Sequence, residues 1–345
     1  MQKWYEDKRC EEGPVIGGQV CLVRNIAGYP FSEKMEPDQK KNLREEVENA
    51  VCAEEAGTGS QFHLIELSDE KDDCCNALIG TQTVPPLMFS RTAGAALLVT
   101  DDESVSILIN GQEHLCIQVS IAGNRIQEAL AKANRIDDLL NRHLTYAYSS
   151  RYGYLTASPL YTGTGMSASY LIHLHYLERA QLIAKYQKEY SQFGFTLHGC
   201  FRGKNAAPGR VYRLKNRRTL GLSENEVISS LEQLASQLEA QEEKSFRLGG
   251  DEEKEYEIDQ IYRAYGVLRY ARDLDYEETL VYLSYLRAGQ LHGILKEETQ
   301  APVTAMMFGI HDAVLEKRIS RGETMKDSVR RAQYLRDVLP QIDPA

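Results

Sequence analysis

The chain has 345 residues, with 40 Lys and Arg against 50 Asp and Glu, so its formal net charge is −10 with His neutral. This length suggests about two domains, and 42% hydrophobic with 26% charged residues is typical of globular proteins and argues against wholesale disorder. The acidic excess disfavours a protein that works by neutralising nucleic-acid phosphates, so we expect no nucleic-acid partner.

The chain also lacks the usual signals for export or membrane insertion. Residues 1–13 contain no apolar stretch of the kind found in signal peptides, and the apolar run near 93–99 is too short to span a bilayer. Cysteine occurs seven times, an odd number, and never as C-x-x-C, so neither a disulfide framework nor a zinc ribbon is predicted. We expect a soluble protein of the reducing cytoplasm with no membrane partner.

Hydrophobic periodicity predicts the following elements in chain order. Helices are predicted over 39–53, 125–144 and 166–187, a loop over 152–165, and strands over 62–67, 95–100, 104–110 and 115–120. We expect the strands of 95–120 to form a hairpin with its turn near 100–103. Ser223 and Glu226 have the spacing of a capping box, which predicts a helix from there to about residue 240.

An acidic segment with a Gly-Gly pair, residues 241–257, is the best linker candidate in the chain. Beyond it the pattern is helical to a last predicted helix over 324–339. The sequence therefore predicts two domains, residues 1–245 as an α/β unit and residues 246–345 as a small all-helical unit.

Generic site motifs give only weak signals. His173 and His175 diverge on the predicted helix, which disfavours a metal site. Gly163, Thr164 and Gly165 could present N–H groups to an anion ahead of that helix, although most such triplets are plain turns.

A basic strip, residues 202–218, interrupts the acidic chain with seven cations and no acid. It is either a solvated strand pair or a surface that docks an acidic partner or a phosphorylated group, because Arg binds phosphate through two parallel hydrogen bonds. The cations are Arg202, Lys204, Arg210, Arg213, Lys215, Arg217 and Arg218.

Several segments, taken in order, carry a wider resemblance. Residues 20–31 read VCLVRNIAGYPF, 101–118 read DDESVSILINGQEHLCIQ, 153–169 read GYLTASPLYTGTGMSAS, and 262–272 read YRAYGVLRYAR; Arg202-Gly203 and 219–221 match the ends of another block. Over nearly the whole chain this order resembles the ATP:guanidino phosphotransferase family, and most closely its bacterial protein arginine kinase branch.

The resemblance implies an α+β fold: an antiparallel sheet flanked by helices, followed by a small helical domain that recognises phosphoarginine. The family moves the γ-phosphoryl group of ATP, held with Mg²⁺, to a guanidinium nitrogen. A cage of arginines neutralises the phosphates, and a carboxylate orients the guanidinium and takes its proton.

Carried over position by position, most of this machinery is substituted. The family's cage arginines fall on Gln19, Cys21, Cys116 and Ser167. Its retained nucleotide-side residues are Arg24, His173 and Arg202, and its acidic base positions fall on Gln112 and Glu113.

The phosphoarginine pocket of the branch falls on the last predicted helix. Arg330 and Arg331 remain from its R-D-x-R-R-A-like run, but Asp327 and Ser328 replace the leading Arg-Asp pair. Phosphoarginine binding there is one interpretation, and two arginines on a solvated helix face is the other.

Two hypotheses follow. In the first, the chain is a pseudokinase in protein quality control that needs no cofactor. It would bind an active arginine kinase paralogue, an adaptor or a protease complex, as a homodimer or heterodimer. In the second, it is an active protein arginine kinase using ATP with Mg²⁺, in which Glu113 serves as base and Arg202, Arg210 and Arg213 rebuild the cage.

Overall fold

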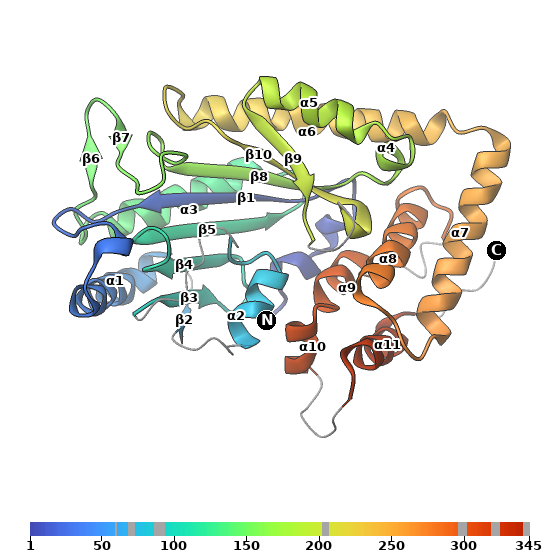
Figure 1. The fold of residues 1–345 in the computed structure, drawn as a ribbon, viewed down its shortest axis with the longest axis horizontal. Coiled ribbons are helices and arrows are strands. Elements are labelled where there is room, and N and C mark those ends of the chain that lie inside the picture. Colours follow the sequence, from blue (N-terminus) through green and yellow to red (C-terminus); the bar gives the residue numbers. More distant parts are fainter. Residues whose placement is uncertain are drawn as a thin grey trace.

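The computed structural model describes residues 1–58, 61–67, 73–85, 94–201, 207–295, 302–318 and 325–340. Its centre is an eight-stranded antiparallel sheet in the order β2-β3-β4-β5-β1-β8-β10-β9 (Figure 1). The strands are β1 Val15–Arg24, β2 Phe62–Glu66, β3 Ala96–Thr100, β4 Val105–Ile109, β5 Leu115–Ala122, β8 Met166–His173, β9 Phe195–Gly199 and β10 Val211–Asn216, with β6 Tyr148–Ser149 and β7 Gly153–Tyr154 as a separate pair.

Helices flank this sheet and make up the secondary structure described in the C-terminal region, which confirms the predicted α+β architecture (Figure 1). The α-helices are α1 Pro37–Thr58, α2 Asp73–Gly80, α3 Ile126–Leu140, α4 His175–Arg179, α5 Ile183–Gln192, α6 Glu224–Arg247, α7 Asp251–Tyr270, α8 Tyr276–Leu291, α9 Val303–Gly309, α10 Asp312–Arg318 and α11 Asp327–Val338. Short 3-10 helices are η1 Trp4–Glu6, η2 Lys8–Cys10, η3 Ser32–Lys34 and η4 Pro208–Arg210.

The strands predicted over 95–120 are confirmed as β3, β4 and β5, paired in sequence order. Their first turn is held by Asp102, whose Oδ1 accepts hydrogen bonds from Thr100 Oγ1 at 2.6 Å and from the Ser104 backbone N–H at 3.0 Å. Such Asx contacts give the backbone a local partner at a tight turn.

The single helix predicted over 166–187 is wrong. Residues 166–173 form β8, and only then do α4 and α5 follow. Because β8 lies between β1 and β10 and is covered on both faces, both of its sides carry buried residues. A short apolar run of this kind cannot be told from a buried helix by periodicity alone.

The acidic segment 241–257 is mostly helical rather than an extended linker. Helix α6 continues to Arg247 and α7 begins at Asp251, so only residues 248–250 separate them. The acids of this segment stabilise the start of α7, since negative charge is favourable at a helix N-terminus. The capping box at Ser223 is confirmed: its Oγ accepts a hydrogen bond from the Glu226 backbone N–H at 3.2 Å.

The two faces of the sheet are covered by different elements. One face packs against α1, α3, α5 and α6 in the largest apolar cluster. On the other face, a small apolar cluster forms around α2, and the C-terminal helices build a third cluster with η1 and η2. Between these two groups the sheet carries polar residues. No helix in the described ranges is long and apolar enough to cross a membrane.

Side chains of the central strand β1 alternate between these faces. Val20 and Leu22 join the large cluster under the helices, and Arg24 lies on the same side, where it pairs with Asp137 of α3. Arg24 Nη2 donates to Asp137 Oδ2 at 2.7 Å, and the guanidinium carbon lies 3.6 Å from the centre of the Tyr154 ring. Only 1% of the Arg24 surface is exposed, so this ion pair is an interior contact that fixes α3 on the sheet.

We expect Arg24→Met to lower the free energy of unfolding by about 3–5 kcal/mol, because the buried Asp137 carboxylate loses its partner. Urea unfolding followed by circular dichroism measures this loss. The matched control is Arg142→Met, which removes the exposed arginine of the pair with Glu54, a carboxylate that keeps its contact with His143, and should cost less than about 1 kcal/mol. Equal losses of unfolding free energy in the two variants would contradict the conclusion that Arg24 and Asp137 form an interior ion pair.

Candidate functional site

A cavity of about 260 Å³ opens on the polar part of the sheet, and we call it the sheet pocket. Its wall is formed by strands from both halves of the sheet and by the loop that follows α2. Polar and ionisable residues dominate the lining: Gln19, Cys21, Gln82, Gln118, Tyr161, Ser167, Ser169, His198, Cys200, Arg213 and Lys215.

The four substituted cage positions come together at this pocket. Gln19 and Cys21 of β1 and Ser167 of β8 line it, and Cys116 of β5 is disulfide-bonded to Cys21. The positions meet because β1 pairs with both β5 and β8, and side chains two residues apart on a strand share a face. The structure thus brings together residues that lie up to 148 positions apart in the chain.

A hydrogen-bonded set of glutamines closes one side of the pocket. Gln19 Nε2 and Gln118 Nε2 both donate to the backbone carbonyl of Gln82, at 2.9 and 2.8 Å. Arg213 joins this set: its guanidinium donates to Gln19 Oε1 and Gln82 Oε1, both at 2.6 Å, and to Ser169 Oγ at 2.9 Å. Each amide is held by a partner, so the wall is an ordered polar network.

The charge of the pocket comes from β10. Burial lowers the pKa of Arg213, and burial together with Arg213 lowers the pKa of Lys215 to about 8. Burial and both cations lower the pKa of His198 to about 4, so this imidazole is neutral at pH 7. Lys215 lies over the Tyr161 ring, 5.6 Å from its centre.

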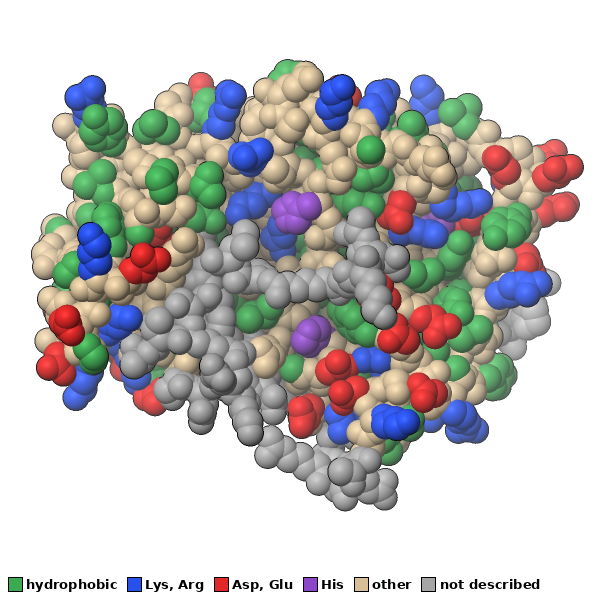
Figure 2. Space-filling model, in the orientation of Figure 1, with side chains coloured by type: hydrophobic (Ala, Val, Ile, Leu, Met, Phe, Trp, Pro, Cys, Tyr) green, Lys and Arg blue, Asp and Glu red, His purple; other side chains and the backbone are tan. Residues whose placement is uncertain are grey.

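The basic strip is therefore not simply a solvated strand pair. Arg213 and Lys215 face the sheet pocket, whereas Arg210 turns to the other end of β10 and contacts His175. Only Arg217 and Arg218 are exposed, and Arg202 and Lys204 lie outside the described residues. On the face drawn in Figure 2, Lys and Arg gather along the upper edge, over α5 and α6, and acidic side chains over α7 and the C-terminal helices.

The predicted base positions lie in the turn between β4 and β5, outside the pocket lining. Glu113 is 2% exposed and its carboxylate is fully engaged. It accepts hydrogen bonds from Asn25 Nδ2 at 2.7 Å and from the backbone N–H groups of Ala157 and Ser158 at 2.8 and 2.9 Å. This carboxylate anchors the loop after β7, and the neighbouring Gln112 has no acidic group.

The retained nucleotide-side residues do not gather at the pocket. Arg24 lies on the opposite face of β1, in its pair with Asp137, and Arg202 lies outside the described residues. His173 is buried at the end of β8, with Nε2 2.8 Å from Ser284 Oγ of α8.

His175 extends this contact to α7. Its Nδ1 lies 3.0 Å from the same hydroxyl, Ser284 Oγ, and its Nε2 lies 2.6 Å from Glu257 Oε1. Burial, then the neighbouring Arg210, holds the pKa of His175 well below 6.5. Since Ser284 is fully buried, this network ties the sheet to the C-terminal helices and presents no accessible hydroxyl.

The last helix places its two arginines differently from either expectation. Arg331 is buried, not solvated: its guanidinium donates to the carbonyls of Ile310 and Leu274, at 3.1 and 2.6 Å, and pairs with Asp312. Arg330 pairs with Asp327 one turn earlier. Arg331 therefore holds α11 against its neighbours, and phosphoarginine binding by this helix stays a prediction.

The Gly163–Gly165 triplet is used for packing. A Cβ on Gly163, whose φ is +117°, would lie 2.4 Å from the Thr219 carbonyl oxygen, and one on Gly165 would lie 2.6 Å from Arg24 Nη1. Only glycine fits such close approaches. The N–H groups of Gly163, Thr164 and Gly165 donate to the backbone carbonyls of Tyr154, Thr219 and Tyr161, so they are already engaged and not presented to an anion.

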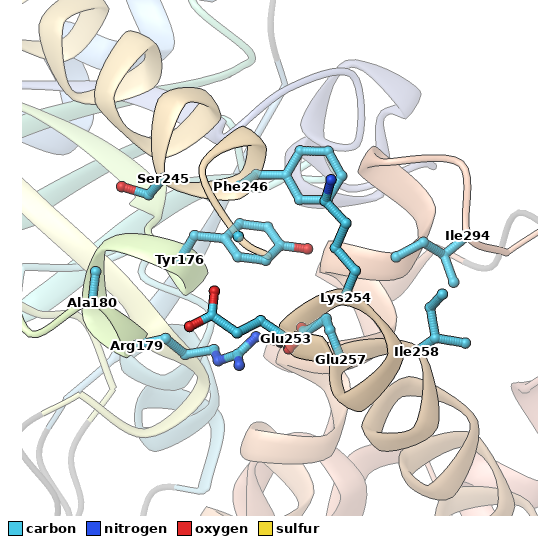
Figure 3. A pocket seen from close by; sticks show the side chains of 11 residues that line it. Tyr176, Arg179, Ala180, Ser245, Phe246, Glu253, Lys254, Glu257, Ile258 and Ile294 are labelled. Carbon is cyan, nitrogen blue, oxygen red and sulfur yellow. Dashed lines mark hydrogen bonds and ion pairs between the residues drawn. The ribbon is translucent and has the colours of Figure 1, made fainter. Parts of the chain in front are cut away.

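A second cavity, of about 250 Å³, lies between α4, the end of α6 and α7 (Figure 3). Tyr176 and Phe246 face Lys254, Ile258 and Ile294 across it (Figure 3). Sequence reasoning missed this cavity because it depends on how the C-terminal helices pack against α4.

The sheet pocket lacks the family's arginine cage for ATP with Mg²⁺ at the four substituted positions. The cage positions supply two amide or hydroxyl side chains and two bonded sulfurs in place of guanidinium groups. Within the described ranges no cluster of three His, Cys, Asp or Glu is arranged to hold a metal ion. We therefore derive no phosphoryl-transfer step through this site.

The disulfide between Cys21 and Cys116 was not expected from the cysteine count. The two residues lie on neighbouring antiparallel strands, offset by two in register, with Cα atoms 6.2 Å apart. Register across a sheet decides such a pair, and spacing along the chain does not show it.

Two family models match consecutive parts of the chain. The model of the ATP:guanido phosphotransferase C-terminal catalytic domain matches residues 42–245, and that of the Protein-arginine kinase McsB C-terminal domain matches residues 255–345. Protein-arginine kinases from Clostridium kluyveri and Clostridium novyi are 33% and 30% identical, covering 98% and 99% of this chain and 99% and 100% of their own lengths.

Solved structures show the same fold at low identity. The duplicated taurocyamine kinase of Schistosoma mansoni has a TM-score of 0.56 at 17% identity, covering 65% of this chain and 32% of its own. A lombricine kinase has a TM-score of 0.54 at 18% identity, covering 66% of each chain. These findings confirm the resemblance seen in the sequence.

We expect unreduced protein, unfolded and alkylated, to yield the Cys21 and Cys116 peptides joined, with Cys10, Cys52 and Cys200 alkylated. Because the bond closes a loop of 95 residues, its reduction should lower the free energy of unfolding by about 2–4 kcal/mol. Peptide mass spectrometry and urea unfolding measure the two effects. In Cys116→Ser, reductant should change neither the peptide pattern nor the free energy of unfolding. Alkylation of both Cys21 and Cys116 in the unreduced wild type would disprove the bond.

Proposed function

This chain belongs to the protein-arginine kinase branch of the ATP:guanido phosphotransferase family, and we propose that it is a pseudokinase that acts by binding partner proteins. The observation that carries the proposal is the sheet pocket, where the four cage positions meet without a guanidinium group among them.

The loss of rate expected from these substitutions favours loss of catalysis. Losing one preorganised donor to a transition state typically costs about 10²–10³ in rate, and losing a general base costs about 10²–10⁴ more. These losses do not simply add. Four replaced arginines together with Gln112 at the base position nevertheless leave too little stabilisation for practical turnover.

The family residues that remain support the fold. Asn110 Nδ2 donates to the carbonyls of Lys40 and Gly94, at 2.8 and 2.9 Å. His114 Nδ1 accepts from the Ile26 backbone N–H at 3.0 Å. A chain that keeps these contacts while its site is replaced fits selection for a folded binding surface.

The proposed partners are those of protein quality control in the cytoplasm: an active arginine kinase paralogue, an adaptor or a protease complex. A paralogue is the partner that a shared fold would serve best, since homologous chains commonly pair through matching surfaces. Pairing with such a kinase would give a heterodimer, and pairing with itself a homodimer.

The second candidate, an active protein-arginine kinase with a rewired site, has one observation in its favour. Arg213 points into the sheet pocket and could replace one cage guanidinium. Two other parts of that hypothesis find no support, because Glu113 is engaged by three N–H donors and Arg210 lies beside His175.

A phosphoryl-transfer assay separates the two candidates. We expect the pure protein, incubated with labelled ATP, Mg²⁺ and an arginine-rich protein substrate, to form no acid-labile phosphate above background. The Clostridium kluyveri relative serves as the positive control. Transfer within about a hundredfold of that relative, abolished by Arg213→Met but retained by Arg217→Met, would establish the active kinase instead.

A further inference from the structure

Two cations share the sheet pocket without an acid to balance them. Arg213 and Lys215 lie two residues apart on β10 and line the same cavity, so about 7 Å separates their Cα atoms. Among the described residues neither forms an ion pair, although ion pairs are common elsewhere in the structure. The segments 86–93 and 202–206 follow lining residues in the chain and lie outside the described residues, and their sequences contain no Asp or Glu.

The buried position and the neighbouring arginine disfavour the charged form of the lysine. Burial and Arg213 lower the pKa of Lys215 to about 8, so the pocket holds its second charge only below that pH. The other titratable groups facing Lys215 do not offset the charge. His198 is neutral, burial raises the pKa of the Cys200 thiol, and burial followed by the Glu113 charge raises the pKa of Tyr161.

Donors that are free to bind a ligand surround these charges. The ammonium group of Lys215 and the hydroxyls of Ser167 and Tyr161 have no hydrogen-bond partner among the described residues, and all three side chains line the cavity. The guanidinium of Arg213 is held in place by Gln19, Gln82 and Ser169. A ligand would therefore meet a positive, prearranged surface, which lowers the entropic cost of binding.

The volume of the cavity limits the size of the ligand that it can hold. Pockets for drug-sized molecules have volumes of about 300–1,000 Å³, and this one measures about 260 Å³. The polar side chains in its lining offer donors and positive charge, which suit an anion carrying several acceptor oxygens.

We propose that the sheet pocket binds a small doubly charged oxyanion, of the size of phosphate or sulfate, between Arg213 and Lys215 of β10. The proposal rests on the proposed function in one respect, since it places this anion where an active family member would hold its nucleotide. The cations come from β10, at positions that the family resemblance does not assign to the cage.

Calorimetric titration of the full chain with sulfate tests the site, because sulfate keeps its double charge across the pH range needed. We expect saturable binding at pH 7 that weakens about tenfold by pH 9, one unit above the pKa of Lys215. Protonated Lys215 is the binding form, so affinity falls as the pH rises. Inorganic phosphate should compete with sulfate, and acetate, with a single charge, should compete poorly.

Matched variants localise the binding. Lys215→Met and Arg213→Met should each weaken sulfate binding at least tenfold, and Lys215→Met should also abolish the change between pH 7 and pH 9. Arg217→Met removes an exposed arginine two residues beyond Lys215 and should bind as the wild type does. Unfolding temperatures measured without sulfate identify a variant that has lost its fold. In that case the pH dependence of sulfate binding by the wild type still tests the site.

Absence of saturable sulfate binding, or binding unchanged in Lys215→Met, would overturn the anion site. Neither result bears on the pseudokinase proposal, which the phosphoryl-transfer assay tests separately. Conversely, phosphoryl transfer together with sulfate binding lost in Lys215→Met would overturn the pseudokinase proposal and leave the anion site standing.

Discussion

The two-residue alternation of side chains along β1 is the constraint on which the site depends. This strand is the fifth of eight in the sheet order and is bonded on both edges, so each of its side chains must suit one of two closed environments. The Arg24 side chain lies on the helical face, where it pairs with Asp137, and the side chains of Gln19 and Cys21 line the pocket on the other face. Because the faces are independent, the pocket could change completely while the packing beneath α3 stayed as it was.

The replaced residues of the pocket form a coherent set. Gln19 and Gln118 both donate hydrogen bonds to the Gln82 carbonyl, and Gln19 also accepts one from Arg213. The substituted residue on β1 therefore has partners on β5, on β10 and in the loop after α2. The glutamine side of the pocket is thus fully hydrogen-bonded, and this order limits the groups that can meet a ligand to the lysine and hydroxyl side chains opposite it.

Local signals in the sequence predicted local structure well. The hairpin over 95–120 and the Ser223 cap depend on residues close together in the chain, and both were found. The strand β8 was missed because its burial between β1 and β10 erases the alternation that marks an exposed strand. The substituted cage positions followed from the family resemblance, but the parts played by Gln82, His198 and the Cys21–Cys116 bond depend on strand register, which motif spacing does not encode.

The position of Arg24 has a consequence for how members of this family are compared. A pattern search that counts surviving arginines would treat Arg24 as a remnant of catalysis, although its guanidinium holds α3 to the sheet. From Gln19 to Arg24 in this chain, odd positions of β1 face the sheet pocket side and even positions face the helices. An arginine kept at an even position of this strand is therefore a marker of stability, and its presence says nothing about whether the pocket on the other face still performs chemistry.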